Sequence, residues 1–174
     1  MQVSPRILQG DRELIQIVDA ALAEAARRSG SWLVCRPGCA ECCIGPFSIT
    51  ELDAARLRRG LAELKHTNPE RAGRILDRAR HATGAEDEDC PALDPETRTC
   101  DVYSSRPITC RTFGPPVRCG EEAVGVCELC FEGASDEEIA ACEVEIDPDD
   151  VEAGLLCEIG GGETTVAAAI CAAG

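Results

Sequence analysis

The sequence has few aromatic side chains: 174 residues include three Phe, one Trp and one Tyr. Methionine occurs once, so the apolar residues that could form a core are mainly small or aliphatic. We expect one domain over residues 1–174, with its core in about 11–146 and an Ala-rich tail over 147–174. Because so small a set of bulky residues buries little surface, bound metal is expected to supplement packing.

Histidine is also scarce, since only His66 and His81 are present. Hydrolytic zinc sites keep an open position and often use histidine ligands, so such a site is poorly supported. Both histidines fall on polar segments, where we expect them to be solvated. The sequence also lacks a Ser/His/Asp arrangement, a phosphate loop and a Rossmann fingerprint. Whether the protein is an enzyme is therefore left open.

Long apolar runs are missing as well. The longest uncharged stretch, residues 164–174, is too short to cross a bilayer. Residues 1–6 lack the basic-then-apolar pattern of a signal peptide. We therefore expect a cytoplasmic protein with no membrane association.

Positive charge is in the minority, with 17 basic against 32 acidic side chains and a formal net charge of −15. A chain this acidic repels phosphate backbones, which argues against nucleic-acid binding. A solvated surface explains the charge, and so does docking to a basic protein. The partner that we expect is a protein, either a redox partner or a client.

Cysteine, by contrast, is abundant: there are 13, and four of them fall in the run Cys35-x3-Cys39-x2-Cys42-Cys43. This spacing brings sulfurs close enough to share a metal or a metal–sulfur cluster. Disulfide bonding and simple packing of thiols are the alternatives. Cytoplasmic thiols stay reduced, and an odd number cannot all pair within one chain, so metal binding is favoured.

Helical periodicity marks residues 11–29, 50–64 and 69–80. Asp11 is a plausible N-cap of the first helix, and Asn68-Pro69 resembles the start of the third. A capping box, with Ser135 as N-cap and Glu138 at the third position, predicts another helix. The tail is expected to form one or two short helices. The predicted fold is therefore mainly α, with irregular cysteine-rich loops and at most a small hairpin.

The second half of the chain supplies more thiols. Cys90 and Cys100 flank a turn sequence, which predicts a loop pair that places them side by side. Prolines make residues 105–116 mostly irregular. Cys157 and Cys171 lie in the Ala-rich tail, where we expect buried free thiols.

Eight thiols are predicted to bind metal together, in two four-thiolate sites or one larger assembly. Cys42 and Cys43 would point in different directions on an extended backbone and could serve two sites, whereas a disulfide between them would be strained. The predicted metal ligands are Cys35, Cys39, Cys42, Cys43, Cys90, Cys100, Cys110 and Cys127.

The combined pattern resembles the YkgJ-type cysteine-cluster family, which is associated with zinc or iron chelation and with iron–sulfur oxidoreductase-like proteins. The resemblance rests on four parts of the sequence. They are the run Cys35-x3-Cys39-x2-Cys42-Cys43, the segment Cys90-Pro91-Ala92-Leu93, the stretch Cys100-x2-Tyr103-x2-Arg106-Pro107-x2-Cys110-Arg111-x-Phe113, and the 127–131 region. It covers about residues 11–146. Cys119, Cys130 and Cys142 fit the pattern less firmly.

Four other side chains near the thiols are of interest. Arg106 and Arg111 are candidates to contact a cofactor by donating hydrogen bonds to cluster sulfurs, or they pair with surface carboxylates. Tyr103 is interpreted as loop packing. Trp32 covers one side of the site or belongs to the core.

Three functions remain: a redox or cofactor-handling protein with an iron–sulfur cluster, a zinc-stabilised interaction domain, and a metal chelation or delivery protein. We favour the first, with a cluster of the 4Fe-4S type and zinc as the alternative, because thiolates are ligands for both.

Overall fold

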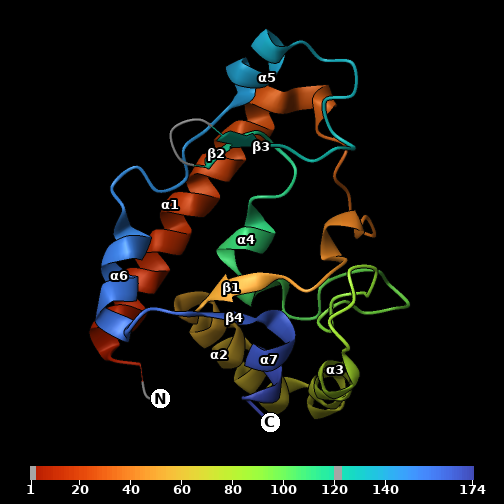
Figure 1. The fold of residues 1–174 in the computed structure, drawn as a ribbon, viewed down its shortest axis with the longest axis vertical. Helices are drawn as coiled ribbons and strands as arrows, with labels where there is room; N and C mark the ends of the chain where they lie inside the picture. Colours follow the sequence, from red (N-terminus) through yellow and green to blue (C-terminus); the bar gives the residue numbers. More distant parts are fainter. Residues whose placement is uncertain (1–2, 120–122) are drawn as a thin grey trace. The chain divides into compact units, whose positions relative to one another are not determined.

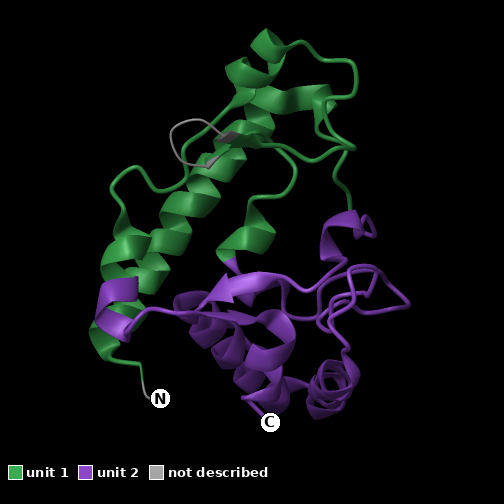
Figure 2. Cartoon of the chain, viewed as in Figure 1, with its two compact units in different colours: residues 1–36, 108–155 green, residues 37–107, 156–174 purple. Residues whose placement is uncertain are grey.

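The computed structural model describes residues 3–119 and 123–174, apart from the side chains of 119 and 123. The fold is mainly helical, as predicted, with short two-stranded sheets (Figure 1). Two compact units make up the chain (Figure 2): unit 1 comprises residues 1–36 and 108–155, and unit 2 comprises 37–107 and 156–174. The single domain over 1–174 stays a prediction. Within the described ranges, no helix has both the length and the apolarity needed to cross a membrane.

Unit 1 contains the longest helix, α1 (Pro5–Ser29), which begins earlier than predicted. Its N-cap is Ser4, whose Oγ accepts a hydrogen bond from the Ile7 amide at 3.3 Å. The predicted N-cap, Asp11, is instead buried inside the helix, so that prediction was wrong. Proline at the first helical position has a suitable φ and needs no amide partner, so Ser4-Pro5 starts the helix six residues upstream. The stop at Ser29-Gly30 is confirmed.

The remaining elements of unit 1 are short. They are the 3₁₀ turn η1 (Gly30–Trp32), α4 (Ile108–Arg111), the antiparallel strands β2 (Val117–Cys119) and β3 (Ala123–Gly125), α5 (Asp136–Cys142) and most of α6 (Val151–Ile159). The capping box of α5 is confirmed: Ser135 Oγ accepts from the Glu138 amide, and Glu138 Oε2 accepts from the Ser135 amide. The short helix α4 lies within residues 105–116, a stretch whose prolines had predicted mostly irregular structure.

Unit 2 is built around α2 (Glu51–Thr67) and α3 (Pro69–His81). Asn68 caps α3, as predicted. Thr50, where the second helix was expected to begin, is the N-cap of α2, and α2 continues three residues beyond the predicted Leu64. The apolar face of α3 is buried in the core of this unit. Its members are Ala72, Ile75, Leu76 and Ala79.

The tail completes unit 2. Strand β4 (Glu163–Thr165) pairs antiparallel with β1 (Ser48–Thr50), so that Thr164 lies opposite Ile49, and α7 (Val166–Cys171) follows directly (Figure 1). The short helices predicted for the tail are confirmed, whereas β4 was not predicted. A three-residue strand carries almost no sequence pattern, and its partner lies more than a hundred residues away, so only the fold could reveal it.

Candidate metal centre

The first thiol loop of unit 2 carries Cys39, Cys42 and Cys43. Gly38, with a φ of 90°, makes the turn before Cys39, and the 3₁₀ turn η2 (Glu41–Cys43) follows. The extended backbone expected at Cys42 and Cys43 is therefore wrong. In a 3₁₀ turn neighbouring side chains do not alternate across a strand, and the two thiols form a hydrogen bond with each other.

This loop lies alongside the chain that leads into Cys90. The Cys90 amide donates to the Cys43 carbonyl at 2.7 Å, and the Gly45 amide donates to the Glu88 carbonyl at 2.8 Å. Between them, Ile44 and Asp89 form an isolated antiparallel bridge. Backbone hydrogen bonds thus hold two cysteine-bearing segments together that lie almost fifty residues apart in the sequence.

The loop pair predicted between Cys90 and Cys100 is confirmed. Leu93 and Cys100 form an antiparallel bridge, and the Asp101 amide donates to the Ala92 carbonyl at 2.8 Å. Asp94 Oδ1 accepts hydrogen bonds at the turn, including one from the Thr97 amide at 2.8 Å. Cys90 is buried in the core of unit 2, and Cys43 and Cys100 pack against the same core.

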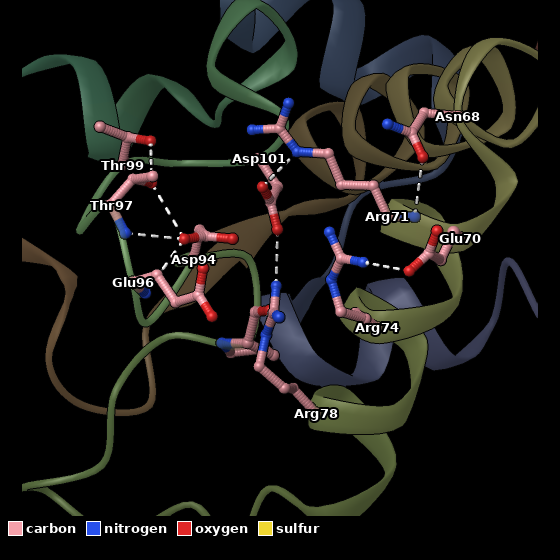
Figure 3. A network of polar contacts seen from close by, with 11 residues as sticks. Asn68, Glu70, Arg71, Arg74, Arg78, Asp94, Glu96, Thr97, Thr99 and Asp101 are labelled. Carbon is pink, nitrogen blue, oxygen red and sulfur yellow. Dashed lines mark hydrogen bonds and ion pairs between the residues drawn. The ribbon is translucent and has the colours of Figure 1, made fainter.

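Two arginines of α3 anchor this loop through Asp101 (Figure 3). Arg71 and Arg78 each pair with the Asp101 carboxylate, the latter at 2.7 Å, and the Asp101 side chain is fully buried. Arg78 Nε also donates to the Pro91 carbonyl at 2.8 Å. Because Asp101 follows Cys100 and Pro91 follows Cys90, one helix fixes the position of both thiols.

Sequence reasoning missed this anchor, although a signal was present. Arg71 and Arg78 are seven residues apart, which places them on one face of a helix two turns apart. A basic stripe on a predicted helix is a natural partner for an acidic residue in a neighbouring loop. Nothing local to Asp101, however, distinguishes it from the many solvated carboxylates of this chain.

Three thiols of unit 2, Cys42, Cys90 and Cys100, resist ionisation in the metal-free chain. Burial raises the pKa of Cys90 to about 11 and also raises the pKa of Cys100. The pKa of Cys42 is raised by its hydrogen bond with Cys43 and then by burial. A bound metal would have to displace these protons, because thiolates are the ligand form.

Nearby arginines act against this trend: Arg78 lowers the pKa of Cys90, and Arg71 and Arg106 lower that of Cys100. The charge of Arg106 also lowers the pKa of Cys42, where the hydrogen bond with Cys43 and burial outweigh it; at Cys100 burial does so. The guanidinium lies 3.8 Å from the centre of the Tyr103 ring, a cation–π contact, and Nη1 donates to the Tyr103 carbonyl. Tyr103 itself lies in the 3₁₀ turn η3 (Tyr103–Ser105) and is exposed.

Unit 1 carries the other predicted ligands, Cys35, Cys110 and Cys127. Cys35 Sγ lies 4.0 Å from Cys130 Sγ, and the Cys127 side chain forms a hydrogen bond with Cys130. Burial raises the pKa of Cys127. Cys110 lies on α4. Sulfurs that share a tetrahedral metal at about 2.3 Å are about 3.8 Å apart, close to the Cys35–Cys130 separation.

Arg111, the second candidate to contact a cofactor, is buried in unit 1. Its Nη1 donates to Asp19 Oδ1 at 2.5 Å, so it has the carboxylate partner that the alternative interpretation foresaw. Trp32 stacks on Phe131, with ring centres 6.1 Å apart, beside buried Cys130 and Cys142. Trp32 therefore packs in the cluster that contains Cys130 and Cys142, and whether it covers a metal site stays a prediction.

The eight predicted ligands thus divide between the units. Three lie in unit 1, and unit 2 holds Cys39, Cys42, Cys43, Cys90 and Cys100. Among the side chains that the structure describes, no three of His, Cys, Asp or Glu are arranged as a metal site. The donor set nevertheless fits zinc or iron chemically, because it consists of cysteine thiols that form no disulfide. The assignment of the eight as ligands stays a prediction.

The remaining thiols and histidines give one correction. Cys157 and Cys171 are exposed, so their predicted burial was wrong. Helix α7 buries Val166, Ala169 and Ile170, which turns position 171 outward. His66 and His81 are exposed, as predicted. The side chain of Cys119 lies outside the described part of the chain, while Cys130 and Cys142 are buried.

These features define a cysteine-rich domain whose thiol-bearing loops are held on a helical frame. The chain belongs to the CxxCxxCC family, described as a putative zinc- or iron-chelating domain, whose model matches residues 34–143. The family name has two residues between its first two cysteines, and this chain has three. Neither a curated protein nor a solved structure matches the chain.

Proposed function

We propose that the protein holds an iron–sulfur cluster through cysteine thiolates, of the 4Fe-4S type, and acts in redox or cofactor handling. The observation that carries the proposal is that Cys43, Cys90 and Cys100 all pack in or against one core, with Cys42 in contact with Cys43. Sulfur is the donor that such clusters require. Membership of a family described as zinc- or iron-chelating supports the same chemistry.

Each residue of unit 2 would have a distinct part in holding the cluster. Cys39, Cys42, Cys43, Cys90 and Cys100 are the proposed thiolate ligands within this unit. Arg71 and Arg78 keep the loop in place through Asp101. Arg106 would offset thiolate charge, because its charge already acts on two of these sulfurs. When bound, the cluster supplies one-electron transfer at a potential that nearby charge and hydrogen bonds tune.

A four-thiolate zinc site that stabilises an interaction domain is the alternative. The family description favours it equally, since it names zinc as well as iron. The loops of unit 2 join segments far apart in the sequence, which is the use that structural zinc has in small domains. The net charge of −15 would suit a basic protein partner under either function.

Metal analysis of anaerobically purified protein, together with its visible absorption spectrum, separates these functions. Iron with matching sulfide and a broad visible band is expected for the cluster. A colourless protein that holds zinc would overturn the cluster in favour of the alternative, and a protein without bound metal would overturn both. Cys100→Ser should lose the metal, whereas Cys157→Ser, at an exposed thiol, is the matched control.

A further inference from the structure

Unit 1 contains a pair of thiols that lie in contact across 95 residues of sequence. Cys35 Sγ is 4.0 Å from Cys130 Sγ, with Cys35 exposed and Cys130 buried. Cys35 is the accessible member, which a small oxidant can reach, and Cys130 is the protected member behind it.

The backbone around this pair is firmly held. The Phe131 amide donates to the Trp32 carbonyl at 3.3 Å, and the two rings stack at 15° to each other. Phe131 has a φ of 61°, a strained conformation for an aromatic residue that persists only where the surroundings impose it. Burial of the Phe131 ring against Trp32 provides this constraint and thereby orients the preceding Cys130.

A third segment closes on Cys35 from the loop after α4. A Cβ added at Gly114 would lie 3.2 Å from Cys35 Sγ, and the φ of 118° at Gly114 is one that glycine adopts readily. The Cys127 amide donates to the Gly114 carbonyl at 3.4 Å. Three segments of unit 1 therefore fix the place of the Cys35 sulfur.

We propose that Cys35 and Cys130 are a redox-active dithiol that closes to a reversible intramolecular disulfide when the protein meets a peroxide. Cys35 attacks the peroxide O–O bond, gives a sulfenic acid and releases water when the oxidant is hydrogen peroxide. Cys130 then attacks the Cys35 sulfur, which forms the S–S bond and releases a second water. The two thiols lose two electrons and the peroxide gains them. A thiol reductant reverses the reaction.

Geometry makes this closure accessible. A disulfide is about 2.05 Å long, so the sulfurs must approach by about 2 Å, which small side-chain rotations can provide. Cys127 also touches Cys130, which makes it the competing partner. Exposure favours Cys35 as the thiol that reacts first. Closure would also withdraw Cys35 from metal binding, but the dithiol does not depend on the proposed cluster.

The test is to oxidise the reduced full-length chain with hydrogen peroxide, block the remaining thiols with iodoacetamide and digest with a protease that cleaves after glutamate. This digestion separates Cys127 from Cys130, because Glu128 lies between them, and releases residues 129–132 with Cys130 as the one cysteine. Mass spectrometry should find this fragment joined through Cys35 to the fragment of residues 25–41. Fragment-ion spectra distinguish Cys35 from Cys39. Dithiothreitol should release the link.

Variants make the result decisive. Cys35→Ser should abolish the link to Cys130, whereas Cys142→Ser, at a buried thiol of the same cluster, should leave it intact. In Cys130→Ser the sulfenic acid on Cys35 should persist and be trapped by dimedone. The same oxidation in urea should lose the preference for this pair. A link from Cys130 to Cys127, no link in the folded protein, or equal selectivity in urea would overturn the proposal.

Discussion

Arg78 Nη2 lies 2.7 Å from Asp101 Oδ2, and the Asp101 side chain is fully buried. The same guanidinium contacts the Pro91 carbonyl. This single side chain therefore connects α3 to both ends of the loop that carries Cys90 and Cys100. The contact between Arg78 and Asp101 is drawn in Figure 3. It explains how a loop with little regular structure can present two thiols at fixed positions.

Asp101→Ala should destabilise the protein by about 2–4 kcal/mol, because two arginines lose their buried partner. The cost should lie below that of a fully buried ion pair, since Arg71 and Arg78 are partly exposed. Urea unfolding with an unchanged m-value would measure it. Arg74→Ala is the matched control on the same helix. Arg74 pairs with exposed Glu70, so its loss should cost about 0.5 kcal/mol or less. Equal effects of the two changes would contradict the anchor.

A pair of glycine substitutions tests the packing of unit 2. An added Cβ at Gly60 in α2 would overlap the Cβ and Oγ of Ser105, whereas one at Gly73 in α3 would meet open space. Gly60→Ala should therefore lower the free energy of unfolding by about 1–3 kcal/mol through overpacking. Gly73→Ala should raise it by about 0.5–1 kcal/mol, because alanine is the better helix former. Urea midpoints that shift in the same direction would refute this packing.

The stability of the metal-free protein should fall at high pH because of Cys90. Its pKa is about 11 in the folded chain against 9.0 as the ordinary value, so the folded state retains a proton that the unfolded state loses. The stabilisation is complete below pH 9 and is lost as the pH rises to 11, by roughly 2–3 kcal/mol. Free energies of unfolding, measured by chemical denaturation between pH 8 and about 10.5, should fall accordingly. In Cys90→Ala the contribution of this thiol should disappear; an unchanged slope would refute its role.

Replacing each cysteine by serine should divide the thiols into two classes. Changes at Cys35, Cys39, Cys43 or Cys100 should reduce the bound metal per chain, because serine is a poor ligand for the soft metals that thiolates select. Changes at Cys157 or Cys171 should leave it intact, since both are exposed on tail helices. Elemental analysis of each purified variant gives the result. Metal loss at Cys171, or full retention after changing Cys39 and Cys43, would overturn the ligand assignment.

Local sequence determined the helices of this protein and where most of them begin. Thr50, Asn68 and Ser135 are caps because their side-chain oxygens accept amide hydrogen bonds within the next turn. The thiol spacing likewise determined the family and the chemistry of its donors. In each case the interacting groups lie within a few residues, so a sequence pattern can reveal them. Asp11 was misassigned because a better start, Ser4-Pro5, lay just upstream.

Tertiary structure alone decided which thiols meet. The contact of Cys35 with Cys130, the hydrogen bond from Cys90 to Cys43, and the salt bridges of Asp101 all join distant segments. Cys157 and Cys171 were expected to be buried, yet helix packing turned them outward. Burial and side-chain contact depend on which faces of separate elements pack together. Which faces pack together depends on the complete core, so no local sequence pattern can predict it.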